Sequence, residues 1–253
     1  MGVVPRRIKS NYTGIKYFSR RRSGARLKGG DAATPVVPTF SDLARAAYCP
    51  RQLYHARRDD DRGPGDRARE RRELAFRYPT LADAPPERLA ALPVDLDPPA
   101  YRARLRALVE RDDWPAIADP DARGVRLDGK DCRGVAHTLS EAPPVPTFVS
   151  PGRPPDRGVW APQRVRAVAT TLALAWEREQ PVERCRVEYP ASAVVRSVRL
   201  TGRNRRRYRR TLRTVWRMER ETPPRTDDHA KCGSCPYREP CRGKTRSLRS
   251  RLF

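Results

Sequence analysis

The sequence of 253 residues predicts a mixed α/β domain around a small sheet. In some segments the apolar residues recur at spacings of three and four, and in others they alternate one by one with charged residues. The first pattern is typical of amphipathic helices and the second of half-buried strands. The segments follow the order helix, strands, helix, hairpin and helix, which indicates helices packed against one sheet.

The N-terminal part of the domain is expected to be helical. Ser41 fits the N-cap of a helix that is interrupted at Pro50. Short helices are expected at 68–77 and 100–111. Residues 59–70 are typical of an exposed loop, because they consist mostly of Asp, Arg and Gly.

Four segments in the middle and second half of the chain are expected to build the sheet. Residues 123–139 predict two short strands around a turn at Asp128-Gly129. Residues 145–150 form a brief apolar run that is typical of a buried strand. Residues 185–189 alternate apolar with charged side chains, and 194–200 return as a second strand.

Two longer helices are expected beside these strands. One begins at Pro162, where proline suits the first turn, and the other begins at Asn204. The spacing of their apolar residues predicts inward faces for both helices. The first face is formed by Val165, Val168, Leu172 and Trp176, and the second by Tyr208, Leu212, Val215 and either Met218 or Glu219.

Positive charge is concentrated in three segments. The chain has 54 basic and 30 acidic residues, a formal net charge of +24. Residues 1–30, 203–225 and 242–253 carry net charges of +9, +8 and +5. A nearly neutral body with three basic segments indicates a domain that touches a polyanion in defined places. The alternative is a solvated helix face with two basic tails.

The charge pattern also suggests how the chain is organised. We expect a basic, disordered arm over residues 1–39, a domain over 40–241 and a basic tail over 242–253. No apolar run reaches eighteen residues, and the first thirty residues lack the pattern of a signal peptide. A cytoplasmic location without a membrane partner is therefore expected.

Four of the six cysteines form a candidate metal-binding set. Cys232, Cys235 and Cys241 lie within ten residues, and the two-residue gap between the first two lets both thiolates reach one centre. Cys49 is available as the fourth ligand. One remote and three local thiolates favour a 4Fe–4S cluster, in which each iron takes one protein ligand. Zinc is the alternative, although structural zinc more often uses two paired short-gap motifs.

The other two cysteines and two histidines near the cysteine set are weaker candidates for metal ligands. Cys132 and Cys185 have no partner at metal-ligand spacing and are predicted to pack as small hydrophobic residues. His229 lies three residues before Cys232 and is the second choice of ligand. His55 is interpreted as a surface histidine.

Two stretches carry a family resemblance. They are Ser41-Asp42-Leu43 followed by Tyr48-Cys49-Pro50-Arg51-Gln52-Leu53-Tyr54, and Cys232-Gly233-Ser234-Cys235-Pro236-Tyr237 followed by Cys241. Both resemble the CRISPR-associated RecB-like exonucleases, the iron–sulfur type of the PD-(D/E)XK superfamily. The resemblance implies a restriction-endonuclease-like mixed sheet flanked by helices, whose ends are joined by a 4Fe–4S cluster on the four cysteines. It also implies DNA and CRISPR integration proteins as partners.

The catalytic elements of that family are only partly matched. In the family, an Asp on one strand and an acid on the next hold Mg²⁺ or Mn²⁺, and a Lys follows two residues later. Asp131 resembles the first element, and its alternative is an ordinary turn residue. Residues 147–152 offer neither acid nor Lys, and Glu188 is a candidate shifted acid. Gln163 matches the family's helix glutamine, but Ala167 stands where Tyr is expected. Since a single carboxylate holds Mg²⁺ weakly, we expect a degenerate active site.

Three functions remain after these considerations. The first is a DNA-binding iron–sulfur protein with a RecB-like nuclease fold and a degenerate active site. The second is an active Mg/Mn-dependent single-strand DNA exonuclease. The third is a basic zinc-binding nucleic-acid module. In the first, a helix grips phosphates and stacks a base through Arg205, Arg206, Arg207, Tyr208, Arg209, Arg210 and Arg213.

Overall fold

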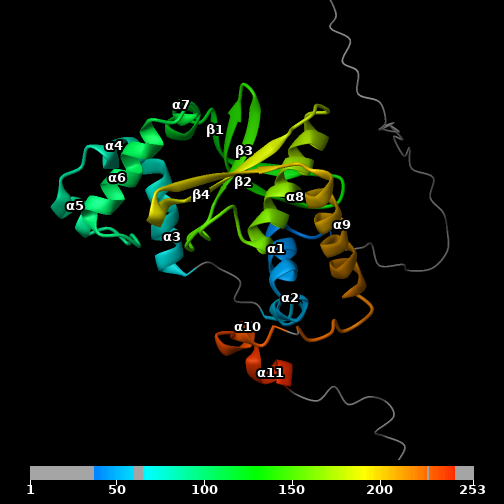
Figure 1. Ribbon diagram of the computed structural model, residues 1–253. Coiled ribbons are helices and arrows are strands. Elements are labelled where there is room, and N and C mark those ends of the chain that lie inside the picture. Colours follow the sequence, from blue (N-terminus) through cyan, green and yellow to red (C-terminus); the bar gives the residue numbers. More distant parts are fainter. Residues whose placement is uncertain (1–36, 60–64, 227, 243–253) are drawn as a thin grey trace, which may run out of the picture. The chain divides into compact units, whose positions relative to one another are not determined.

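The computed structural model describes residues 37–59, 65–226 and 228–242 (Figure 1). The arm expected over residues 1–39 and the tail expected over 242–253 lie outside these ranges, except for the few residues next to the domain. Within the described ranges, no helix is long and apolar enough to cross a membrane.

A five-stranded mixed sheet forms the centre of the domain, with strands in the spatial order β1-β2-β3-β4-β5. Neighbouring strands are antiparallel except for β3 and β4, which are parallel and are connected through the long helix α8 (Ala161–Glu177). The strands are β1 (Ala122–Asp128), β2 (Arg133–Glu141), β3 (Pro144–Val149), β4 (Arg184–Tyr189) and β5 (Val194–Arg199). The mixed α/β class expected from the sequence is confirmed.

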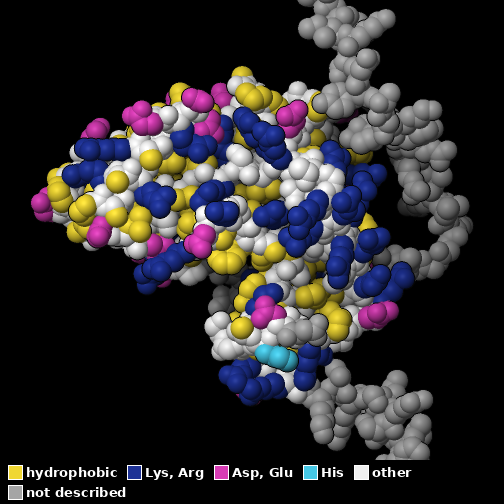
Figure 2. All heavy atoms as spheres, in the orientation of Figure 1, with side chains coloured by type: hydrophobic (Ala, Val, Ile, Leu, Met, Phe, Trp, Pro, Cys, Tyr) yellow, Lys and Arg dark blue, Asp and Glu magenta, His cyan; other side chains and the backbone are white. Residues whose placement is uncertain are grey.

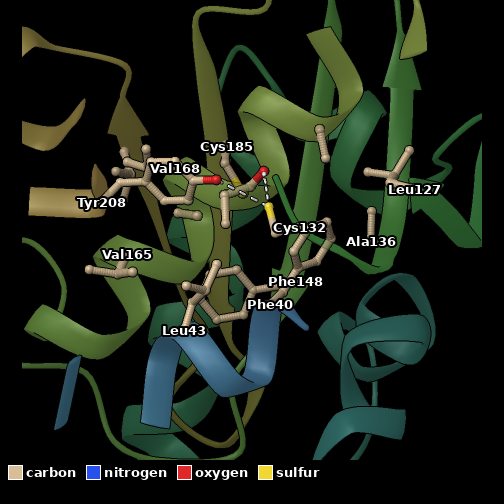
Figure 3. Close-up of a cluster of buried hydrophobic side chains, with 14 of the residues drawn as sticks. Phe40, Leu43, Leu127, Cys132, Ala136, Phe148, Val165, Val168, Cys185 and Tyr208 are labelled. Atoms are coloured by element: carbon tan, nitrogen blue, oxygen red, sulfur yellow. Dashed lines mark hydrogen bonds between the residues drawn. The ribbon is translucent and has the colours of Figure 1, made fainter. Parts of the chain in front are cut away.

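One face of the sheet is covered by helices from both ends of the domain. α1 (Phe40–Tyr48) and α9 (Gly202–Arg217) both pack against α8. Their side chains and those of the sheet form a common core that contains Phe40, Phe148 and Tyr208 (Figure 3). The expected inward face of α9 is confirmed, because Tyr208, Leu212, Val215 and Met218 are all buried.

A second layer of short helices covers the other face. Its core joins Tyr78, Tyr101 and Leu105 to Val149 and Val195 of the sheet. The layer consists of α3 (Asp66–Glu73), the 3-10 turn η1 (Leu74–Arg77), α4 (Tyr78–Ala82), α5 (Pro86–Ala90), α6 (Pro98–Val109) and α7 (Trp114–Ala118). A second 3-10 turn, η2 (Pro190–Ser192), connects β4 to β5.

The first helix begins earlier than the sequence predicted. Thr39, and not Ser41, is the N-cap of α1: its hydroxyl accepts from the Asp42 amide at 3.0 Å, and the Asp42 carboxylate accepts from the Thr39 amide at 3.2 Å. This reciprocal capping box satisfies two backbone donors, which a cap at Ser41 cannot do. Pro50 starts the separate helix α2 (Pro50–Ala56), so the expected interruption is confirmed.

Two other expectations are wrong because of what packs around each element. Trp176 was expected to face inward from α8 but is 49% exposed, since it lies near the end of the helix. β4 was expected to be half-buried but is buried on both faces, including Arg186 and Glu188. It is an inner strand between two helical layers, so its charged residues are buried as well.

Candidate metal centre and nucleic-acid interface

The four cysteines of the candidate set line one cavity of about 330 Å³. Cys49 comes from the junction of α1 and α2, and the other three come from the segment of α10 (Ala230–Gly233) and α11 (Arg238–Arg242). Figure 1 shows these C-terminal helices beside α2. Gln52 and Cys235 are 183 residues apart in the chain, yet the Gln52 Nε2 lies 3.9 Å from the Cys235 sulfur.

Local backbone structure presents each thiol to the cavity. Cys49 is at once the C-cap of α1 and the N-cap of α2, with extended backbone, because Pro50 ends the first helix and starts the second. The amides of Cys232 and Cys241 donate within single helical turns, to His229 and Tyr237 respectively. The backbone of each cysteine is therefore satisfied, and all four thiols are free of disulfides.

The cavity has a strongly basic lining. Five basic side chains contribute to it, whereas no Asp or Glu does so among the described residues. Lys and Arg side chains around a metal centre can balance the negative charge of its thiolate ligands. The basic residues are Arg51, Arg225, Lys231, Arg238 and Arg242.

The four cysteines line one cavity, and their grouping bears on what that cavity can hold. In the described part of the chain, no group of three or more His, Cys, Asp or Glu side chains is placed to hold a single metal ion. A 4Fe–4S cluster needs a wider arrangement, since each thiolate binds a different iron. The residues that are present therefore fit a cluster in their number, chemical type and shared cavity.

Both histidines near the cysteines also line the cavity. His229, the second choice of ligand, is exposed. The interpretation of His55 as a surface residue is wrong: it is half-buried and stacks on Tyr237 with ring centroids 5.9 Å apart. Burial, followed by the charges of Arg51 and Arg58, lowers its pKa. The stacking of His55 on Tyr237 could not be predicted from the sequence, because the two residues are far apart in the chain.

The remaining cysteines behave as predicted. Cys132 and Cys185 are buried in the main core, and burial raises the pKa of the Cys132 thiol to about 11. The Cys132 sulfur lies 3.4 Å from the Tyr208 hydroxyl (Figure 3). Tyr208 is thus only 2% exposed and cannot stack on a base, which corrects the sequence prediction. It cannot line the inward face of α9 and bind nucleic acid at the same time.

The arginines of α9 form an exposed basic face. Figure 2 shows Lys and Arg side chains gathered over this helix and over the C-terminal helices. Arg206, Arg210 and Arg213 follow the i, i+4, i+7 spacing that places residues on one side of a helix. Of the predicted contact residues, Arg205 is half-buried, and the exposed ones are Arg206, Arg207, Arg209, Arg210 and Arg213.

An exposed aromatic residue on this helix was missed from the sequence. Trp216 is 39% exposed and lies three residues after Arg213. Its indole can offer the stacking surface that Tyr208 does not. The available signal was the spacing of Trp216 from Arg209 and Arg213, which places it on the arginine side of the helix.

Gln163, one of the two candidate catalytic residues, is held in a structural network. Its Nε2 donates to the Ser150 hydroxyl at 2.7 Å, and its Oε1 accepts from the Trp160 amide at 3.2 Å. The Tyr189 hydroxyl also donates to Oε1. Gln163 thereby ties the start of α8 to the ends of β3 and β4.

Asp131, the other candidate, lies away from Gln163 in the turn between β1 and β2. The neighbouring Cys132 sulfur is 3.9 Å from the Ala169 carbonyl oxygen, in the middle of α8. Ala169 is six residues beyond Gln163, which corresponds to about 9 Å along a helix. The structure therefore does not bring the two candidates into one site.

Glu188, the candidate shifted acid, is buried on the sheet face opposite α8, near Tyr78. Burial raises the pKa of its carboxyl to about 8, and Asp113 adds to this shift, while Arg186 and Tyr78 oppose it. The carboxyl is therefore largely protonated at neutral pH.

Glu188 is expected to make stability depend on pH. Its pKa rises from 4.5 to about 8 on folding, so between these values the folded state binds one more proton than the unfolded state. The free energy of unfolding then falls as pH rises, by up to about 1.4 kcal/mol per pH unit. Urea unfolding between pH 5 and pH 8 should show this fall in the natural protein and a flatter profile in Glu188→Gln. Exposed Glu183→Gln is the control, and equal profiles in all three proteins would contradict the assignment.

Together, the residues place a basic cavity with four thiols at the joined ends of the domain and an arginine face on α9. The first gathers four thiols without placing three of them around a single metal ion in the described part of the chain, and the second is an exposed positive surface that can attract a polyanion. No family model and no curated protein sequence matches the chain.

Proposed function

We propose that the protein is a DNA-binding iron–sulfur protein with a RecB-like nuclease fold and a degenerate active site. The observation that carries the proposal is the single cavity lined by Cys49, Cys232, Cys235 and Cys241. The resemblance to CRISPR-associated RecB-like exonucleases implies this pairing of remote cysteines. On the same ground, CRISPR integration proteins are the proposed partners.

The cysteine pattern favours an iron–sulfur cluster over zinc. One remote and three local cysteines suit a cluster, in which each iron takes one protein ligand, whereas structural zinc more often uses two paired short-gap motifs. The four thiolates would hold the cluster, with the basic lining balancing their charge. When bound, the cluster would supply a covalent link between α2 and the C-terminal helices.

The order of elements supports a nuclease-like fold with lost chemistry. The resemblance requires a strand, a second strand and a helix that carries glutamine, and β2, β3 and α8 follow in that order. β3 and the residue after it offer Phe148 and Ser150 but no acid or Lys. Asp131 lies apart from Gln163, and Glu188 faces the other side of the sheet. This arrangement supports binding without cleavage over an active exonuclease.

An anaerobic assay with the purified protein tests the function. Single- and double-stranded DNA oligonucleotides are titrated by fluorescence anisotropy, and the same substrates are incubated with Mg²⁺ and with Mn²⁺. We expect binding that weakens steeply with salt and no cleavage by the natural protein or by Asp131→Ala. Cleavage that disappears in Asp131→Ala would instead establish the active exonuclease, and absence of binding at low salt would refute the proposal.

A further inference from the structure

His137 lies where β2 and β3 part. The regular pairing of these strands ends at Thr138 and Thr147. Beyond this point the Val149 amide donates to a side chain of β2 and not to its backbone. The acceptor is the Nδ1 of His137, at 2.7 Å. The imidazole is therefore anchored at the end of β3.

This hydrogen bond determines which ring nitrogen carries the proton. A nitrogen that accepts from a backbone amide has no hydrogen, so the proton of a neutral imidazole is on Nε2. Burial, followed by the charges of Arg166 and Arg72, lowers the pKa of His137 to about 3. The neutral ring with an Nε2–H group is consequently the form present around neutral pH.

A second donor faces this group. The Nη2 of Arg166 on α8 lies 3.5 Å from the His137 Nε2, and a guanidinium nitrogen cannot accept a hydrogen bond. Two N–H donors thus face one another without an acceptor between them. The ring of Phe148 lies 4.7 Å from the Arg166 guanidinium carbon and covers another side of it.

The positive charge of this cluster is also uncompensated. Arg72 on α3 is close enough to add to burial in lowering the pKa of Arg166, to about 10. The Nε atoms of Arg72 and Arg166 are buried without a hydrogen-bond partner, and neither side chain is paired with a carboxylate in the described part of the chain. Buried like charges are costly, and a bound water does not neutralise them, whereas an anion does.

We propose that His137, Arg166 and Arg72 form a binding site for a phosphate group, whose oxygen accepts from the His137 Nε2–H and the Arg166 Nη2–H. Guanidinium groups match the oxygens of phosphate in charge and geometry. The group is either a phosphodiester of bound nucleic acid, in which case the inference rests on the proposed function, or free inorganic phosphate. This site is separate from the arginines of α9 and from the cysteine cavity.

NMR of the histidine side chains in the full chain tests the site directly. The sequence has three histidines, and His137→Gln identifies the signals of the ring in question. We expect the proton on Nε2 and a saturable movement of the Nε2–H signal when inorganic phosphate is added, with no such movement in chloride of equal ionic strength. A proton on Nδ1, or no saturable movement, overturns the proposal.

Charge-matched variants show whether the contact is specific. Arg166→Gln and Arg72→Gln are each expected to weaken phosphate binding by about tenfold or more, as for a lost hydrogen bond to a charged group. Arg72 is half-buried on the outer helix α3, so its variant keeps the test available if Arg166→Gln fails to fold. Arg178→Gln removes an exposed arginine at the end of α8 and should change binding by less than about twofold. Equal losses in all three variants overturn the specific site.

Oligonucleotide binding distinguishes the two sources of phosphate. If a phosphodiester occupies the site, Arg166→Gln and added inorganic phosphate both weaken DNA binding more than Arg178→Gln and chloride do. If free phosphate is the ligand, the DNA affinity of Arg166→Gln equals that of Arg178→Gln. Both results support the site, and the phosphate titration remains decisive even for a protein that binds no DNA.

Discussion

Replacing Cys49 with alanine is expected to abolish the visible absorbance and essentially all bound iron of protein purified without oxygen. The natural protein should contain about four irons per chain, one for each thiolate ligand. Cys49 is the only one of the four cavity cysteines that comes from the N-terminal side of the domain. Its loss therefore removes a ligand and also the link between the two ends. Absorbance, together with iron, sulfide and zinc analysis, measures the result.

The same variant should release the C-terminal helices while leaving the sheet folded. α10 and α11 bury no residue completely, so hydrophobic packing contributes little to holding them. Limited proteolysis should then cut within residues 228–242 in Cys49→Ala, with the far-UV circular dichroism nearly unchanged.

Cys132→Ala is the matched control for the metal centre. This cysteine is buried in the main core, away from the cavity, so the variant should retain its iron even if it is less stable. Stoichiometric zinc without absorbance near 400 nm in the natural protein would identify the zinc module instead. Iron that persists in Cys49→Ala would contradict the assignment of the fourth ligand.

Neutralising the exposed side of α9 is expected to reduce DNA affinity strongly. The triple variant Arg206→Gln, Arg210→Gln and Arg213→Gln removes three charges from one helix face without touching the buried stripe. Each lost phosphate contact should reduce the slope of log affinity against log salt by about 0.9 on double-stranded DNA. The full effect is thus a slope smaller by about 2.7 and a loss of affinity that is largest at low salt. Fluorescence anisotropy at several salt concentrations measures both.

The control must change the net charge by the same amount. Arg88, Arg104 and Arg106 are exposed on α5 and α6, the layer of short helices on the other face of the sheet. Their triple replacement by Gln should leave the salt slope nearly unchanged if DNA binds at α9. Equal losses in the two triple variants would show that overall charge, and not this face, controls binding.

Much of the fold was accessible from local patterns. The turn after Asp128 and the strands on both sides of it follow from alternation and glycine placement, which act between neighbouring residues. The helix that begins near Pro162 and the buried stripe of α9 follow from periodicity. Three of the four candidate cysteines came from spacing, since they lie within one short segment, whereas Cys49 is remote in the chain.

Other features depend on contacts between distant segments. Tyr208 suits both an inward stripe and a base-stacking role, and only the packing against Cys132 shows that it is buried. The approach of His137 to Arg166 depends on how β2 departs from β3 beside α8. No spacing rule joins residues on separate elements in this way.

The sequence by itself determined the strands, the longer helices, the basic segments and the C-terminal cysteine motif, because periodicity, charge and ligand spacing are local properties of the chain. The tertiary structure alone decided that Cys49 shares a cavity with the C-terminal cysteines and that Asp131 and Gln163 lie apart. It also decided that Glu188 is enclosed between two layers. The physical reason is that burial, cavity lining and the pairing of charges depend on which distant surfaces pack together.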